Sequence, residues 1–293
     1  MAQQIPVDDQ ATTGIEIPDE AVVEITPDLA YRRLAMVNIV LFGQPKSREW
    51  VLIDAGLPAT AGMIAHSAEA RFAADAPPAA ILLTHGHIDH VGALRTLAER
   101  WNVPIYAHVL EHPYLNGTSA YPKPDPNVGG GVMSVLSKLF PRGPLDVSQW
   151  LRPLPEDGSV PFMPGWRWIH TPGHSVGHVS FWREADRSLI AGDAFITTAQ
   201  ESAYAVAAQE PELHGPPMYF TPDWQKAGAS VTALAGLEPE IVVTGHGRAM
   251  QGPGMRTALH QLAEQFDRVA VPHDGYYVGN PARVEDGTAY PTR

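Results

Sequence analysis

The chain carries the motif Thr-His-Gly-His-Ile-Asp-His at 84–90, directly after the apolar run Ala-Ala-Ile-Leu-Leu. Four of its side chains can bind a metal, namely His85, His87, Asp89 and His90. A tight turn at a strand end can bring together side chains that a regular strand or helix would separate. Imidazole and carboxylate together suit zinc or a similar metal. The motif therefore predicts a metal site where a strand gives way to a helix.

Three further candidate ligands each lie beside a glycine and just past an apolar segment typical of a strand. They are His174, Asp193 and His246. Proteins of the α/β class place their chemistry at such strand ends, and a neighbouring glycine lets the backbone turn sharply. Any one of these residues alone could be an ordinary loop residue, but the set in this order indicates one shared site.

These residues and their order resemble the metallo-β-lactamase-fold hydrolase superfamily. The resemblance extends from the strand pair near Val37 to the helix ending near Val269, and Asp54 in Asp-Ala-Gly fits the early Asp-x-Gly motif of that family. It implies an α/β fold, an αββα sandwich with two sheets face to face and helices outside, in a single domain. The alternation of strands and helices alone would also allow a doubly wound sheet.

The resemblance also implies a dinuclear site. By position, His85, His87 and His174 bind one metal, Asp89, His90 and His246 bind the second, and Asp193 bridges both. The expected cofactors are two divalent ions, Zn²⁺ in the first instance, and the lack of Cys excludes a thiolate ligand. Hydroxide held by the metals is expected to attack a carbonyl. Asp89 is the catalytic residue that orients this hydroxide and can carry a proton.

Two more residues are expected to orient the ligands. Asp54 ends its strand beside the cluster and can fix an imidazole. His178 follows His174 by four positions, and it either supports a ligand or makes a purely structural hydrogen bond.

The composition limits the classes of molecule that the protein is expected to bind. A net charge of −12 and a pI near 5.5 argue against a nucleic-acid partner. No run approaches the roughly 18 apolar residues of a membrane helix, and the N-terminus lacks the pattern of a signal peptide. We expect a cytoplasmic protein that acts on a small molecule and contacts neither membrane nor nucleic acid. The oligomeric state stays open, a homodimer included.

Along the chain, we expect a polar arm over 1–20 and one domain over 21–293, with a lid-like insertion at about 111–155. This insertion could equally be a dimer contact. Predicted strands cover 35–42, 50–53, 79–83, 103–107, 166–170, 179–182, 188–191 and 241–244. Predicted helices cover 59–74, 91–101, 132–140, 226–237 and 254–269.

The irregular segments 111–155 and 197–223 are rich in large apolar side chains. We predict that these segments face each other over the metals and form an apolar pocket for a neutral substrate with a hydrophobic part. Core packing under the loops is the alternative. The candidate lining residues are Tyr114, Tyr121, Met133, Phe140, Tyr204, Met218, Tyr219 and Phe220.

The leading functional hypothesis is a zinc-dependent lactone or carboxylic ester hydrolase. Lactonases of this family commonly carry a Tyr three residues after the bridging Asp, where this chain has Ile196. Thioester hydrolysis of the hydroxyacylglutathione type is an alternative, although the tail after Val269 is short and lacks Lys. Weak β-lactamase activity and iron-dependent sulfur dioxygenation are further alternatives, and metal analysis separates oxidation from hydrolysis.

Overall fold

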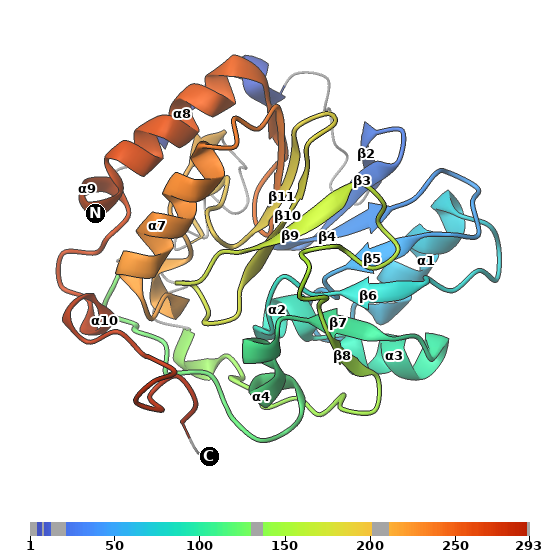
Figure 1. The fold of residues 1–293 in the computed structure, drawn as a ribbon, viewed down its shortest axis with the longest axis horizontal. Coiled ribbons are helices and arrows are strands. Elements are labelled where there is room, and N and C mark those ends of the chain that lie inside the picture. The colour runs from blue at the N-terminus through green and yellow to red at the C-terminus, as the bar shows by residue number, and fades with distance from the viewer. Residues whose placement is uncertain (1–4, 8, 13–21, 130–136, 201–210, 292–293) are drawn as a thin grey trace.

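The computed structural model describes residues 5–7, 9–12, 22–129, 137–200 and 211–291. Two β-sheets lie between two layers of helices (Figure 1). The predicted αββα sandwich in one domain is therefore confirmed, and the doubly wound alternative is wrong.

The first sheet has seven strands in sequence order, β2 to β8. The strands from β2 to β5 pair antiparallel, and those from β5 to β8 pair parallel. Because β5 and β6 are parallel, the residues that follow them emerge at the same edge of the sheet. The strands are β2 (Val22–Thr26), β3 (Leu29–Leu34), β4 (Val37–Phe42), β5 (Val51–Ile53), β6 (Ala80–Leu82), β7 (Ile105–Ala107) and β8 (Leu151–Pro153).

The second sheet has five strands in the order β14-β13-β11-β10-β9. Only β11 and β13 pair parallel, which places the residues after both strands at one edge. Its strands are β9 (Trp166–His170), β10 (Val179–Arg183), β11 (Ser188–Gly192), β13 (Ile241–Thr244) and β14 (Met250–Gln251). A separate short pair joins β1 (Ile5–Pro6) to β12 (Glu212–Leu213).

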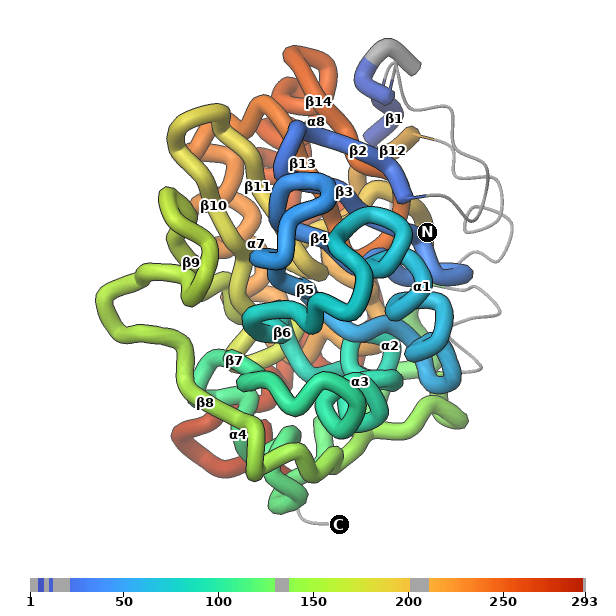
Figure 2. Tube along the Cα trace, turned by 90° about the vertical axis from the view of Figure 1, so that its right-hand side faces the viewer, coloured from blue at the N-terminus to red at the C-terminus, as the bar shows by residue number. Residues whose placement is uncertain are grey.

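Helices cover the outer face of each sheet. Helices α1 (Ala61–Arg71) and α3 (Leu94–Trp101) lie on the seven-stranded sheet, in front of its strands in Figure 2. Helices α7 (Trp224–Ala235) and α8 (Gly252–Glu264) cover the five-stranded sheet on the opposite side. Shorter helices are α2 (Ile88–Val91), α4 (His112–Leu115), α9 (Phe266–Val269) and α10 (Tyr276–Gly279), with 3-10 turns at Asp9–Thr12, Val109–Glu111, Ser137–Leu139 and Met218–Phe220.

The side chains of β5 show why its sequence is apolar throughout. Val51 and Ile53 pack between the two sheets, whereas Leu52 packs toward the helices outside. Phe181 and Ile190 of the second sheet meet them from across the central layer. A strand buried on both faces needs apolar residues at every position, because successive side chains alternate between the faces.

Several elements differ from the prediction. Strands β2 and β3 were not expected, and the segment 111–155 contains α4 and the edge strand β8. The expected helix at 132–140 lies mostly outside the described residues, and its remaining part forms the 3-10 turn Ser137–Leu139. The last long helix ends at Glu264, and α9 follows after Gln265. Among the described residues, the structure contains no helix with the length and hydropathy required to span a bilayer.

Candidate metal centre

The loop after β6 changes from extended to helical backbone within the His-rich motif. His87 is extended, with φ −64° and ψ 151°, and α2 begins at the next residue. His85 and His87 therefore lie on the extended part, while Asp89 and His90 lie on the first turn of α2. Gly86 fits here because a Cβ at this position would lie 2.8 Å from the hydroxyl oxygen of Tyr121.

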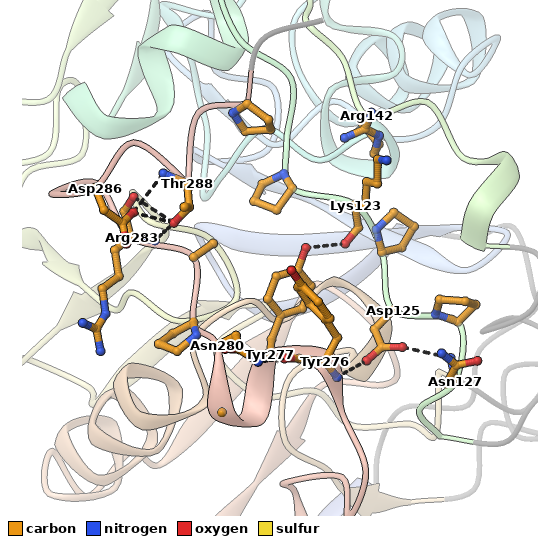
Figure 3. A pocket seen from close by; sticks show the side chains of 17 residues that line it. Lys123, Asp125, Asn127, Arg142, Tyr276, Tyr277, Asn280, Arg283, Asp286 and Thr288 are labelled. Atoms are coloured by element: carbon orange, nitrogen blue, oxygen red, sulfur yellow. Dashed lines mark hydrogen bonds between the residues drawn. The ribbon is translucent and has the colours of Figure 1, made fainter.

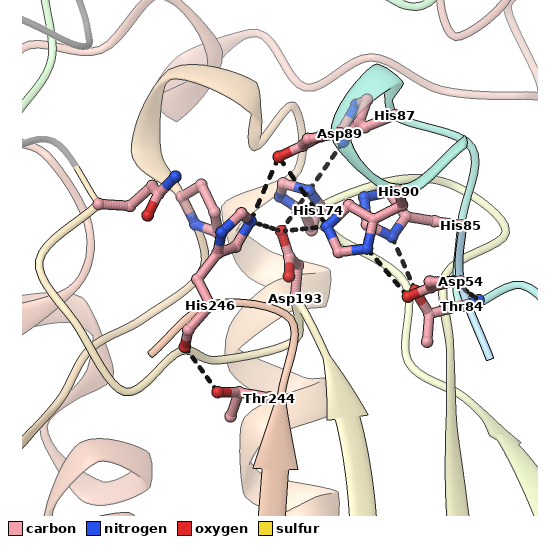
Figure 4. A network of polar contacts seen from close by, with 12 residues as sticks. Asp54, Thr84, His85, His87, Asp89, His90, His174, Asp193, Thr244 and His246 are labelled. Carbon is pink, nitrogen blue, oxygen red and sulfur yellow. Dashed lines mark hydrogen bonds and ion pairs between the residues drawn. The ribbon is translucent and has the colours of Figure 1, made fainter. Parts of the chain in front are cut away.

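All seven predicted ligands converge at one edge of the sandwich (Figure 4). Three overlapping groups each place their ligand atoms within 4.8 Å of one another. These groups are His85 with His87 and His174, His85 with His90 and Asp193, and Asp89 with His90 and His246. The first and third groups coincide with the two sets of three that the sequence resemblance implied.

Asp193 lies between those two sets. Its Oδ2 is 3.5 Å from Nε2 of His174 and 3.1 Å from Nε2 of His246. Asp89 approaches one set only, with Oδ2 3.4 Å from Nε2 of His246. A carboxylate in the position of Asp193 can contact ions on both sides.

The nitrogen and oxygen atoms of these side chains are suited to bind metal cations. Nε2 of His85, Nε2 of His90 and Oδ1 of Asp193 are buried and have no hydrogen-bond partner among the described residues. A buried polar atom without a partner costs about 1–3 kcal/mol, and a bound ion would remove that cost. Imidazole nitrogens and carboxylates without sulfur suit zinc, and also iron.

Burial and neighbouring charges set the protonation of the cluster. Burial lowers the pKa of His87 to about 4, so its imidazole is neutral at pH 7 and able to bind a metal. Burial would also lower the pKa of His246, but the carboxylate of Asp193 outweighs it and raises the value to about 10. Burial would raise the pKa of Asp89, yet the imidazoles of His90 and His246 hold it well below its usual range. The side chains thus leave carboxylates ionised and ready for cations.

The predicted supporting residues both contact ligands. Oδ2 of Asp54 lies 2.9 Å from Nδ1 of His90, and its carboxylate also accepts from the backbone N–H and hydroxyl of Thr84. Nε2 of His178 accepts the backbone N–H of Asp193 at 2.9 Å. His178 therefore holds the backbone of a ligand and makes a structural hydrogen bond at the same time.

His246 is fixed by residues that the sequence did not indicate. Its Nδ1 lies 2.6 Å from the carbonyl oxygen of Met36. The side-chain amide of Asn38 donates to the carbonyls of Thr244, at 2.9 Å, and Gly247, at 2.7 Å. These contacts tie the loop after β13 to the start of β4, across the two sheets.

Glu111 is a third residue that the sequence did not indicate. Its carboxylate is fully buried and accepts from the backbone N–H of Gly86 at 3.0 Å, and from the hydroxyl of Tyr121. It also accepts from the hydroxyl of Ser175 and the backbone N–H of Gly177, both at 2.8 Å. Glu111 thus joins the ligand loop after β6 to the ligand loop between β9 and β10. No pattern in the sequence distinguishes it from other loop glutamates.

The predicted pocket residues separate into three groups. The rings of Tyr121 and Phe220 lie against His87, with centroids 4.3 Å and 4.9 Å away. Both line a small hollow beside that ligand, and Phe140 packs next to Phe220. Met133 and Tyr204 lie outside the described residues.

Tyr114, Met218 and Tyr219 correct the prediction of an aromatic pocket. Tyr114 is buried and donates its hydroxyl to the carbonyl of Ala289 at 2.7 Å. Met218 and Tyr219 belong to the core under α7 and α8. The described parts of the two irregular segments do meet, since the N–H of Asp125 donates to the carbonyl of Tyr219. Most of their apolar side chains, however, pack the core under the loops.

The chain is similar in sequence to probable metallo-hydrolases. The family model of the metallo-beta-lactamase superfamily matches residues 32–246. The probable metallo-hydrolase YflN of Bacillus subtilis strain 168 is 48% identical over 231 residues, which are 79% of this chain and 87% of that protein.

Solved structures share the fold. The crystal structure of TTHA1623 in a di-iron-bound form is 26% identical, with a TM-score of 0.52, and the match covers 84% of this chain and 98% of that one. A beta-lactamase domain protein from Burkholderia ambifaria is 20% identical, with a TM-score of 0.59, over 87% of this chain and 75% of that one, and shows the fold alone.

Proposed function

Since the chain belongs to the metallo-beta-lactamase superfamily and is a metallo-hydrolase, we propose that it is a dinuclear zinc enzyme. Its proposed substrate is a lactone or carboxylic ester with a hydrophobic part near the carbonyl. The observation that carries the proposal is the convergence of seven buried or half-buried ligands, with Asp193 between two sets of three.

When bound, two divalent ions lower the pKa of water to about 7 and polarise a carbonyl oxygen. His85, His87 and His174 would hold one ion, and Asp89, His90 and His246 the other. Asp193 would contact both. The neutral imidazole of His87 and the ionised carboxylates of Asp89 and Asp193 are the forms that such binding requires, whereas His246 would release its proton as an ion binds.

Asp89 is the proposed catalytic residue. Its side chain is 18% exposed, against at most 2% for His90, His246 and Asp193. It therefore borders the open side of the cluster, where a substrate can reach it. Its carboxylate can orient the attacking oxygen and hold a proton that later passes to the leaving group.

Aromatic rings beside the cluster support a substrate with a hydrophobic part. Phe220 and Tyr121 flank His87 in the small hollow, together with Pro122, Pro222 and Tyr277. These rings and prolines can contact an alkyl or aryl group next to the reacting carbonyl, while the hollow itself, at about 10 Å³, holds no more than one water.

The residue three positions after Asp193 helps to decide whether the substrate is a simple ester or a lactone. This position holds Ile196, whose side chain has no hydroxyl to offer a substrate. Ile196 is also buried and exchanges backbone hydrogen bonds with His214. Tyr219 is buried in the core and does not replace one. A simple carboxylic ester is therefore as good a candidate as a lactone.

The test is a hydrolysis screen of the purified protein with metal analysis. We expect about two zinc ions per chain, as the two-metal arrangement requires, and turnover of aryl esters or lactones. Asp89→Asn should keep most of the metal and lose most turnover. A single tightly bound iron with oxygen uptake on a thiol substrate would support sulfur dioxygenation instead, and turnover of thioesters alone would support the thioester alternative.

A further inference from the structure

A larger cavity lies beside the metal centre. Its volume is about 890 Å³, and its walls come from the segments 122–127 and 276–291 with Arg142 between them (Figure 3). This volume falls within the roughly 300–1,000 Å³ of small-molecule sites. Neither the sequence motifs nor the proposed catalytic residues account for it.

The cavity adjoins the small hollow at His87. Pro122, Lys123 and Tyr277 line both of them. The hydroxyl of Tyr277 donates to the carbonyl of Lys123 at 2.7 Å and so joins the two walls at this shared border. The cavity and the hollow therefore meet at this hydrogen bond, with the hollow on the side of His87.

Hydrogen bonds fix the C-terminal wall in place. The N–H of Tyr276 donates to Oδ2 of Asp125 at 2.5 Å, and the N–H of Ala282 donates to the carbonyl of Pro222 at 3.0 Å. The hydroxyl of Tyr290 donates to the carbonyl of Leu110 at 2.9 Å. A wall held in this way is preorganised, which lowers the entropic cost of binding.

The acidic side chains of the cavity already have donors. Asp125 accepts from the backbone of Asn127 and Tyr276, and Asp286 accepts from the N–H and hydroxyl of Thr288. Both carboxylates are thus held in place by neutral donors within their own segments or across the cavity wall.

The basic side chains of the cavity have hydrogen-bond donors without a partner among the described residues. The ammonium of Lys123 makes no hydrogen bond or ion pair with any residue that the structure describes. Arg142 uses Nη1 to donate to the carbonyl of Tyr121 at 2.6 Å, and its other guanidinium donors make no hydrogen bond within the described parts of the chain. Figure 3 shows Lys123 and Arg142 on one side of the cavity and Arg283 with Asp286 on the other. The side with Lys123 and Arg142 carries two positive charges against the single negative charge of Asp125.

We propose that this cavity binds an anionic group, a carboxylate or phosphate, at the end of the substrate remote from the reacting carbonyl. Lys123 and Arg142 bind the anion, and Tyr277 separates it from the metal centre. The inference rests on the proposed hydrolase function and narrows its substrate to an ester with an acidic end. It also revises the prediction of a neutral substrate, because Lys123 and Arg142 place positive charge on the wall of the cavity.

Two matched substrates test the proposal. One is the mono-4-nitrophenyl ester of glutaric acid, and the other carries a methyl ester in place of the free carboxylate. The parent should show a kcat/KM about tenfold higher for the acid, as expected for a charged hydrogen bond. The preference should shrink at high salt, because the cavity is open to solvent.

Lys123→Glu should lower kcat/KM for the acid far more than kcat/KM for the methyl ester, and so abolish that preference. Lys46→Glu is the matched control, since Lys46 is exposed in the loop between β4 and β5, away from the cavity. It changes the net charge equally and should keep the preference. Equal kcat/KM values for the two esters in the parent, or a preference that survives Lys123→Glu, would overturn the proposal.

Direct binding separates this inference from the proposed function. If neither ester is hydrolysed, the hydrolysis screen still decides the proposed function, and calorimetric titration of the metal-loaded protein with monomethyl glutarate still tests the cavity. A Kd about tenfold weaker in Lys123→Glu than in Lys46→Glu would support anion binding. Equal Kd values in the two variants would refute it.

Discussion

Nδ1 of His90 lies 2.9 Å from Oδ2 of Asp54, in a pair that is buried from solvent. When Nδ1 donates its hydrogen to this carboxylate, Nε2 of His90, on the side of the ligand cluster, is the nitrogen that can bind a metal. The carboxylate also accepts from Thr84, so its orientation is fixed by the residue that precedes the first ligand.

Asp54→Asn should therefore weaken metal binding about 10- to 100-fold, the usual effect of losing a residue that supports a metal ligand. The amide can donate to Nδ1 and stabilise the wrong tautomer of His90. Competition with a chromophoric chelator measures the change. Asp75→Asn is the control, because Asp75 is exposed and shares the positive φ of Asp54, at 56° against 61°. Equal affinities in both variants would contradict the assigned role.

Glu111→Gln should destabilise the protein by about 1–3 kcal/mol, because one of two buried backbone donors then faces an NH₂ group. Those donors are the N–H groups of Gly86 and Gly177. Urea denaturation gives the free energy of unfolding, and chelator competition should show weaker metal binding in the same variant.

Tyr121→Phe removes only one donor to Glu111 and should cost less than Glu111→Gln. If Tyr121→Phe proves the more damaging change, the contact of its hydroxyl with Gly86 would matter more than the carboxylate.

Gly245→Ala should abolish metal binding at the second set of ligands. An added Cβ would collide with Oδ1 of Asp193 and with Cε1 of His90. Gly62→Ala is the control, since a Cβ there meets no atom within 4 Å and Gly62 lies inside α1. That change should stabilise the protein by up to about 1 kcal/mol. Metal content and thermal unfolding distinguish the two.

His108 should make stability depend on pH. Burial, followed by the nearby His170 and His112, lowers the pKa of His108 from 6.5 to about 4. As the pH falls below 6.5 the unfolded chain takes up this proton first, so the free energy of unfolding decreases until the pH passes 4. Nδ1 of His108 accepts the N–H of Leu110, and protonation removes that acceptor.

His108→Asn keeps an acceptor for this N–H without a titrating group. Urea denaturation between pH 4 and pH 7 should show a shallower decrease of stability in this variant than in the parent, and identical slopes would argue against His108 as a source of the effect.

The sequence predicts the elements that carry apolar periodicity and the residues with unusual local density. The strands around the ligands and the convergence of His85, His174 and His246 follow from such patterns. Glu111 could not be predicted, because its role depends on loops that are distant in sequence and adjacent only in the folded chain.

The pocket was mispredicted for a related reason. Aromatic residues in irregular segments can face a ligand or the core, and composition does not distinguish these directions. Tyr114 and Tyr219 face the core. The cavity is lined instead by prolines and charged residues from 122–127, by Arg142, and by a C-terminal segment, 276–291, that has no periodicity.

The candidate ligands also lie on both sheets. His85 follows β6 in one sheet, whereas Asp193 and His246 follow β11 and β13 in the other. The separation along the chain means that these side chains meet only after a large loop has closed, a slow step in folding. A refolding chain should therefore regain helical signal before it can retain metal. Metal retention would then show that the two sheets have packed against each other. A metal-binding assay would therefore follow the final stage of folding.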